Sequence, residues 1–134
     1  MEAEVIERPE LLPPLTLAYV GDAVYELYVR QHLLVSGKIR VKGLHEAAVS
    51  YVRAGAQAAI LREFLPGLSE LEQEVVRRGR NAKGQNPRRI DPAEYAMATA
   101  FEALVGYLHL AGHHQRLGAL LAEAVHLLER SPGV

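Results

Sequence analysis

The sequence predicts an all-helical fold of about six helices. Apolar residues recur at helical spacing through most of the 134 residues. The alternating strand patterns and the Asn-Gly or Asp-Gly turns typical of β-hairpins are missing from the sequence. Because 49% of the residues are hydrophobic, the chain can bury a packed core, and intrinsic disorder is excluded. We therefore expect residues 1–134 to form one domain.

The first helix is expected over residues 15–34. It begins after Pro13-Pro14, because proline is well suited to the first turn of a helix, and it ends near Ser36-Gly37. We expect the preceding residues, 1–13, to be a flexible N-terminal segment.

A second helical region covers about residues 42–64, with a break near Ser50, and ends at Pro66-Gly67. Ser69 and Glu72 then have the spacing of a capping box, in which a hydroxyl accepts a hydrogen bond from the first turn. This pair predicts a short helix that runs to about residue 78.

Residues 79–90 have the composition of a loop, because glycine, asparagine and proline all disfavour a helix. Asp91–Glu94 predicts the next helix start, with Asp as cap, Pro at the first helical position and Glu at the third. This helix is expected to stop at Gly112. A last amphipathic helix fills about residues 113–129.

The composition excludes several classes of protein. Cysteine is absent, so disulfides, thiolate zinc sites and a cysteine nucleophile are excluded. No apolar run has the length of a membrane span, and the acidic N-terminus lacks the cationic start of a secretory signal. These features predict a cytoplasmic protein.

Asp22 interrupts a long apolar run, residues 15–29, and is one of only two aspartates in the chain. An ionised carboxylate that is buried without a partner is strongly destabilising, so folding alone favours Ala or Leu at this position. We therefore expect Asp22 to be neutralised by a partner or held for chemistry, and a bound cation would do both.

Glu102 is a second such acid, in the helix expected to end at Gly112, and this helix is apolar almost all round. Gly21 lies beside Asp22 and Gly106 lies one turn after Glu102, although each glycine costs about 1 kcal/mol relative to Ala inside a helix. A small residue permits close approach of another helix or opens space beside the acid. The alternative is that each acid pairs with a buried arginine or a helix end.

Two such acids are candidate ligands of a metal ion. Carboxylate oxygens suit Mg²⁺ or Mn²⁺, and Mg²⁺ usually completes its shell with water and substrate phosphates. Asp22 and Glu102 are therefore candidate catalytic and metal-binding residues. Glu26, one turn after Asp22, is a further candidate ligand, although an exposed glutamate at this spacing is also an ordinary surface residue.

The net charge of −1 conceals a strongly basic segment between residues 77 and 89, in which no acidic residue occurs. Cations in the last turn of a helix also favour its dipole, which accounts for part of the pattern. The continuation of the charge into a loop favours contact with phosphates, and the lack of interleaved aromatics favours a duplex over a single strand. The candidate RNA-binding residues are Arg77, Arg78, Arg80, Asn81, Lys83, Arg88 and Arg89.

Three motifs resemble those of one known family. Residues 17–30, LAYVGDAVYELYVR, resemble the signature helix of ribonuclease III domains, and residues 101–110, FEALVGYLHL, resemble their second acidic motif. Residues 78–83, RGRNAK, resemble Mini-ribonuclease III, the short bacterial branch of the family. The motifs occur in family order between about residues 15 and 116, with no room for a separate double-stranded-RNA-binding domain.

The resemblance implies a compact, all-helical homodimer that hydrolyses double-stranded RNA with Mg²⁺, or with Mn²⁺ in its place, and leaves 5′-phosphate and 3′-hydroxyl ends. It assigns Asp22 and Glu102 to the metal site and Tyr19 to the dimer contact. Full-length ribonuclease III enzymes carry two more acids, at the positions of Ala18 and Thr99, and the Mini branch resembles this sequence in both replacements. That branch matures the precursor of large-subunit (23S) ribosomal RNA, so a ribosomal protein is a candidate partner.

Two other functions fit the residues. The loss of two of the four acids is compatible with a dimeric module that binds structured RNA without cutting it. A purely structural helical protein, with acids that only pair with buried arginines, is a third reading. It predicts no RNA affinity at low salt and no stabilisation by divalent cations.

Overall fold

The structure is a computed structural model that describes residues 4–86 and 89–130. Within these residues the chain forms six α-helices and two short 3₁₀ turns and contains no strand, which confirms the predicted fold class. None of the helices described is long and apolar enough to cross a membrane. The elements are α1 (Pro14–Val35), α2 (Val41–Val52), α3 (Ala54–Phe64), α4 (Glu70–Asn81), α5 (Pro92–Leu110) and α6 (His114–Arg130), with 3₁₀ turns at Pro9–Leu11 and Leu65–Gly67.

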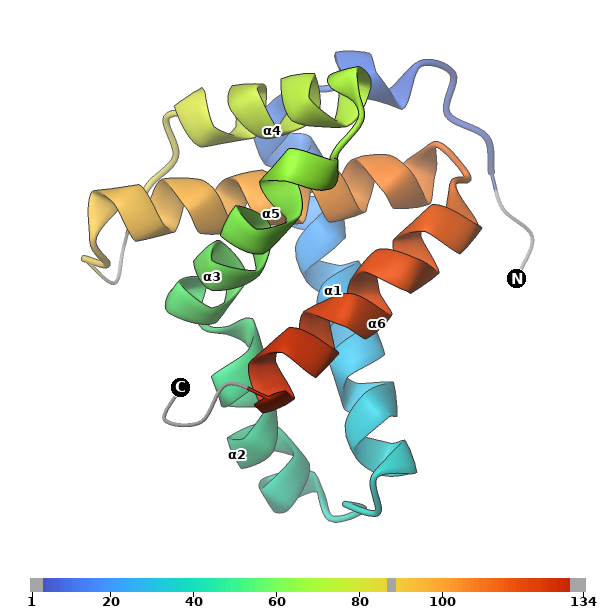
Figure 1. The fold of residues 1–134 in the computed structure, drawn as a ribbon, viewed down its shortest axis with the longest axis vertical. Coiled ribbons are helices and arrows are strands. Elements are labelled where there is room, and N and C mark those ends of the chain that lie inside the picture. Colours follow the sequence, from blue (N-terminus) through green and yellow to red (C-terminus); the bar gives the residue numbers. More distant parts are fainter. Residues whose placement is uncertain (1–3, 87–88, 131–134) are drawn as a thin grey trace.

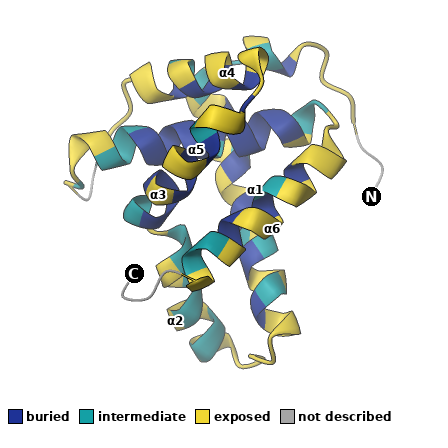
Figure 2. Ribbon diagram, viewed as in Figure 1, coloured by how far each residue is buried: buried dark blue, intermediate teal, exposed yellow. Residues whose placement is uncertain are grey.

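α5 is the central helix of the fold. It is apolar almost all round, and 11 of its 19 residues are buried. α1, α3 and α4 pack against it, as Figures 1 and 2 show. The rings of Tyr25 on α1 and Phe101 on α5 meet edge to face, with their centroids 5.0 Å apart. The core therefore forms around one helix that has almost no face left for solvent.

Several helix ends agree with the sequence. The Ser69 amide donates to Glu72 Oε1 at 2.9 Å and the Glu72 amide donates to Ser69 Oγ at 3.2 Å, which completes the predicted capping box. The Glu94 amide donates to Asp91 Oδ2 at 3.1 Å, as expected for an Asp cap. Gly112 follows α5 with φ of +76°, a left-handed conformation that favours glycine after a helix end.

Two helix boundaries differ from the prediction. The break between α2 and α3 falls at Arg53, whose backbone is extended, and not at Ser50, which stays helical. α4 continues to Asn81 and does not end at residue 78, because Gly79 packs against α5. A Cβ atom on Gly79 would lie 2.9 Å from the Cα of Ala100. Tertiary packing thus outweighs the low helix propensity of glycine.

Part of the N-terminal segment, residues 9–12, packs against the rest of the fold. Pro9 is buried, and Leu12 packs against the core. Arg78 on α4 donates from Nη1 to the Glu10 carbonyl oxygen at 2.5 Å and from Nη2 to the Leu12 carbonyl oxygen at 3.3 Å. Residues 9–12 are therefore held against the body of the fold by a charged side chain.

α1 and α5 cross with their backbones in direct contact. A Cβ atom on Gly21 would overlap the carbonyl oxygen of Glu102 and would lie 2.8 Å from the amide nitrogen of Gly106. A Cβ atom on Gly106 would overlap the carbonyl oxygen of Leu17 in the same way. The obstacles are backbone atoms, which cannot rotate aside, so both positions require glycine.

We expect Gly21→Ala and Gly106→Ala to separate the two helices and to lower the free energy of unfolding by more than about 3 kcal/mol each. Chemical denaturation followed by circular dichroism measures this loss. An unfolding midpoint equal to that of the wild type in either variant would show that the crossing is not tight.

Gly118→Ala is the matched control. Gly118 lies inside α6, and an added Cβ would meet nothing within 4 Å. The same substitution should therefore stabilise the protein by about 0.5–1 kcal/mol, because alanine has the higher helix propensity.

Candidate active site

The α1–α5 crossing brings together the two acids selected from the sequence. Asp22 follows Gly21 on α1, and Glu102 is the residue whose carbonyl oxygen meets Gly21. The charge of Asp22 and a hydrogen bond with Asp22 both act on the Glu102 carboxyl group. Two residues 80 positions apart in the chain thus meet because two glycines let their helices touch.

Asp22 is exposed, which corrects the expectation that it lies in the interior; Glu102 is partly buried. The buried face of α1 consists mainly of residues four apart, namely Leu17, Gly21, Tyr25, Val29 and Leu33. Asp22 stands beside this face and opens to the surface. The apolar neighbours that suggested burial, Tyr19 and Leu27 among them, are themselves exposed.

The pKa of the Glu102 carboxyl group is raised from 4.5 to about 8. Burial is the largest cause, followed by the negative charge of Asp22 and a hydrogen bond with Asp22. A hydrogen bond from Gln57 opposes the shift, and the charge of Glu26 adds slightly to it. Two carboxylates in one partly dry site repel each other, and a cation between them removes that repulsion.

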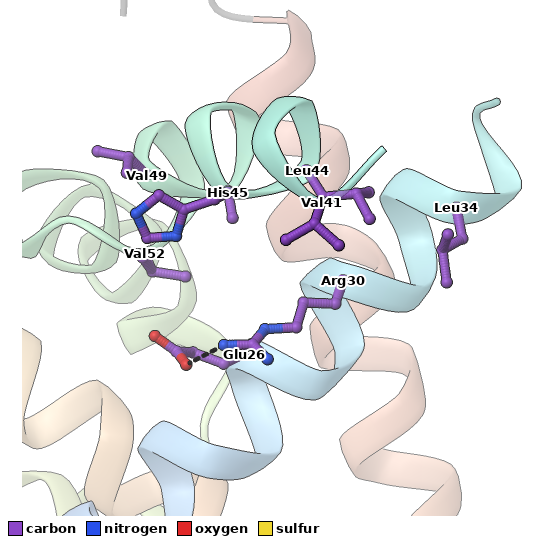
Figure 3. A pocket seen from close by; sticks show the side chains of 9 residues that line it. Glu26, Arg30, Leu34, Val41, Leu44, His45, Val49 and Val52 are labelled. Carbon is purple, nitrogen blue, oxygen red and sulfur yellow. Dashed lines mark hydrogen bonds and ion pairs between the residues drawn. The ribbon is translucent and has the colours of Figure 1, made fainter. Parts of the chain in front are cut away.

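Glu26, one turn after Asp22 on α1, is partly buried and has a partner of its own. It forms an ion pair with Arg30, between Oε2 and Nη2 at 3.3 Å. Both side chains line a cleft of about 400 Å³ between α1 and α2, in which Glu26 lies opposite Val52 and His45 (Figure 3). No group of three His, Cys, Asp or Glu side chains able to hold a metal occurs among residues 4–86 and 89–130.

The positions of the two missing family acids are buried. Ala18 is 7% exposed, and Thr99 is 6% exposed and donates from Oγ1 to the Tyr95 carbonyl oxygen at 3.0 Å. Ala18 has no side-chain oxygen, and neither residue supplies a carboxylate. The candidate metal ligands are therefore two carboxylates, and the site is open to solvent on the side of Asp22. Such a site fits Mg²⁺ or Mn²⁺, because these ions keep several water ligands.

Two of the basic residues have partners within the protein. Arg77 donates from Nε to Glu74 Oε2 at 2.9 Å, so its charge is shared on the surface of α4. Arg78 is half-buried and bound to the Glu10 and Leu12 carbonyl oxygens. The structure thus gives Arg78 a structural partner that the sequence did not indicate.

The other basic candidates lie at and after the end of α4. Arg80, Asn81, Lys83 and Arg89 are exposed, and Arg88 lies outside the described residues. Arg80 and Asn81 are in the last turn of the helix, whose free carbonyl groups favour nearby positive charge. Each of these side chains can reach an anion from outside.

Gln57 is a polar residue that sequence reasoning missed. It lies on α3, is 3% exposed, and donates from Nε2 to Glu102 Oε2 at 3.4 Å. The only signal in the sequence is an amide inside the alanine-rich run of residues 54–61, which is a weak one. The structure places this amide beside the acid pair.

Tyr19 lies on the outer face of α1 and is 82% exposed. Leu15 and Leu27, at multiples of four residues from Tyr19 on the same helix, are 42% and 64% exposed. These three residues, which we call the α1 stripe, form an exposed apolar surface on α1.

The family described as "Ribonuclease III domain" matches residues 15–113. The chain is 58% identical to Mini-ribonuclease 3 of Symbiobacterium thermophilum, over 93% of this chain and 97% of the relative. It is 45% identical to Mini-ribonuclease 3 of Brevibacillus brevis, over 96% and 98% of the two chains.

A crystal structure of a protein from Fusobacterium nucleatum has the same fold, with a TM-score of 0.79 at 28% identity, over 87% of this chain and 93% of the other. These matches include the signature helix and the second acidic motif. The chain therefore belongs to the ribonuclease III family, in its Mini-ribonuclease III branch, and it is an endoribonuclease.

The raised pKa of Glu102 predicts a pH dependence of stability in the metal-free protein. The folded state binds this proton with a pKa of about 8 and the unfolded state with a pKa near 4.5. Protonated Glu102 therefore favours the folded state. This contribution to the free energy of unfolding is complete below about pH 4.5. It is lost as the pH rises to about 8, because the folded state binds more protons than the unfolded state between these two values.

Thermal unfolding in a chelator, at intervals from pH 5 to about pH 8.5, measures this effect for the wild type and Glu102→Gln. The wild type should lose stability relative to the variant, which lacks the titrating group, as the pH rises. If the unfolding temperatures of the two proteins changed with pH in parallel, the raised pKa of Glu102 would be contradicted.

Proposed function

We propose that the protein cleaves double-stranded RNA with Mg²⁺, for which Mn²⁺ can substitute, and that Asp22 and Glu102 hold the cation. The observation that carries this proposal is the meeting of the two carboxylates at the α1–α5 crossing, where the charge of Asp22 raises the pKa of Glu102. The proposed products carry 5′-phosphate and 3′-hydroxyl ends, as in the family that the sequence resembles.

A divalent cation at this site would supply an activated water and would offset the charge that develops on the phosphate and on the departing 3′ oxygen. The protein's own residues prepare this chemistry. Asp22 presents its carboxylate to the surface, where a scissile strand has access. Glu102 would hold the cation as a carboxylate, and Gln57 would support that carboxylate through Nε2.

The RNA duplex is proposed to lie against the exposed side chains at the end of α4. Arg80, Asn81, Lys83 and Arg89 are exposed and offer charge and hydrogen bonds to solvent. Such contacts read the shape of the duplex and its phosphates more than its sequence. Arg77 adds a weaker contact, because Glu74 shares its charge. Arg88 stays a candidate from the sequence alone.

A homodimer with the α1 stripe at its interface is part of this proposal. Tyr19, Leu15 and Leu27 form an apolar surface on one helix, and large exposed apolar residues that cluster in this way mark interaction sites. α2, which lies beside the same helix, has no fully buried residue. A second copy would place two active sites on one duplex, so that each subunit cuts one strand.

The biological substrate is proposed to be the precursor of 23S ribosomal RNA, with maturation in the cytoplasm and a ribosomal protein as a candidate partner. The support for these three points is the likeness to the Mini-ribonuclease III branch. The net charge of −1 also makes capture of RNA depend on the local basic surface and not on the overall charge.

We expect Asp22→Asn and Glu102→Gln to lose cleavage of a duplex RNA substrate by more than about a hundredfold, since loss of mere outer-shell support already costs 10–100-fold. Each variant should keep its fold, since both changes are isosteric and Asp22 is exposed. Single-turnover cleavage in Mg²⁺, with circular dichroism as the folding control, gives the result. Full activity in a folded variant rules out the assigned residue.

The paired variant Arg80→Ala with Lys83→Ala tests RNA binding, whereas the acid variants test cleavage. It should weaken binding to the duplex and flatten the slope of log affinity against log salt by about 2, one for each lost phosphate contact. The acid variants should leave the salt slope nearly unchanged. A wild-type slope in the double variant would mean that these cations do not touch phosphate.

For the dimer, we expect sedimentation analysis to give twice the mass of the chain and Tyr19→Asp to give a folded monomer. A charge in an apolar interface is costly, whereas it costs little on a free surface. Leu71→Asp is the control, because Leu71 is 45% exposed and lies on a different helix, α4. A dimeric Tyr19→Asp variant, or a monomeric wild type, contradicts the proposed interface.

A further inference from the structure

Gln57 is a buried side chain that joins the core of α3 to the acid pair. It is 3% exposed, and its Nε2 atom lies 3.4 Å from Glu102 Oε2. We infer that Gln57 is a positioning residue that holds the Glu102 carboxylate in the orientation in which Glu102 and Asp22 bind the divalent cation. This inference rests on the proposed function, because it takes Glu102 to be a metal ligand.

The orientation of the Gln57 amide is fixed by its neighbours. Nε2 donates to the Val52 carbonyl oxygen at 2.9 Å as well as to Glu102. The Val52 carbonyl is only an acceptor, and so is Glu102 in the carboxylate form that would bind a cation, so the NH₂ group faces them and Oε1 faces away. A flipped amide would place its single oxygen, Oε1, against these two acceptors. The direction of the donor toward Glu102 is therefore set by the chemistry of the site.

A purely structural role for Gln57 explains only one of the two hydrogen bonds that its amide donates. Gln57 satisfies the Val52 carbonyl at the break between α2 and α3, which is useful in itself. Its Oε1 atom, however, is buried and has no hydrogen-bond partner among the described residues. Leaving an acceptor unsatisfied is destabilising, so a residue kept for the Val52 bond alone carries an avoidable cost. The second donor bond, to Glu102, is the feature that only an amide here provides.

The hydrogen bond from Gln57 also explains how two acids can bind the cation without the two further acids that full-length ribonuclease III enzymes carry. The bond engages Glu102 Oε2 from the side of α3, while Asp22 on α1 acts on the same carboxyl group. The bond also favours the ionised form of Glu102, whereas burial and the charge of Asp22 favour the protonated form. Outer partners of this kind fix the direction of a ligand, and their loss typically weakens metal binding.

The test measures binding of Mn²⁺ in the absence of RNA, from the electron paramagnetic resonance signal of the free ion. The wild type should bind Mn²⁺ saturably, and Glu102→Gln should not. Gln57→Leu, which has similar volume and no amide, should raise the dissociation constant about tenfold or more in the folded protein. Gln57→Met is the second variant, in case Leu disturbs the packing of α3.

Gln73→Leu is the matched control. Gln73 on α4 also donates from Nε2 to two carbonyl oxygens, those of Leu65 and Leu68, but it is exposed and far from the acids in the chain. This substitution should leave Mn²⁺ affinity unchanged. Combining Gln57→Leu with Glu102→Gln should cause no loss beyond that of Glu102→Gln alone, because Gln57 acts through Glu102.

The possible outcomes distinguish a failure of the proposed metal site from a failure of the positioning role of Gln57. If the wild type binds no Mn²⁺, the proposed metal site fails, and the role of Gln57 fails with it. If the wild type binds Mn²⁺ and both Gln57 variants bind it equally well, only the positioning role is overturned. An altered unfolding temperature in chelator with unchanged Mn²⁺ affinity shows that Gln57 serves the helix break alone.

Discussion

The direct contact between the backbones of α1 and α5 is the constraint on which the rest of the molecule depends. Helices that carry ordinary side chains at their contact have axes 8–10 Å apart, and side chains then fill the space between them. At Gly21 and Gly106 this space is absent, because an added Cβ atom would overlap a carbonyl oxygen of the other helix. The crossing fixes the distance between Asp22 and Glu102 through the backbone, which is more rigid than any side-chain contact. The acid site is therefore a property of the helix packing and needs no loop to assemble it.

Most of the fold follows from local signals in the sequence. The Ser69–Glu72 capping box, the Asp91 cap and Gly112 set helix ends through atoms within a few residues of one another, so the sequence contains all of the information needed. The end of α4 was predicted wrongly because Gly79 is helical only through its contact with Ala100, which is distant in the chain. The break at Arg53 and the packing of residues 9–12 under Arg78 likewise depend on partners that periodicity does not reveal.

The candidate site was predictable to a similar degree. The coincidence of an acid and a glycine on each of two apolar helices pointed to the correct pair of helices, and the comparisons confirm the family. The sequence pattern could not show that Asp22 is exposed, because an apolar run gives the same signal whether its outer face meets solvent or a second protein surface. Gln57 gave almost no signal, since one amide in an alanine-rich helix acquires its meaning only when Glu102 on another helix comes within reach.

Arg78 shows that charge and contact are separate properties. Its guanidinium group is bound to the carbonyl oxygens of Glu10 and Leu12, so it is not free to grip a ligand. Neutral carbonyl groups do not cancel its positive charge, however, and the field of that charge extends beyond the surface. An approaching polyanion is thus attracted by the charge of Arg78 even where the side chain makes no contact with it. Side chains that speed an encounter through their field can therefore differ from those that hold a complex through contacts, and evolution can adjust one without the other.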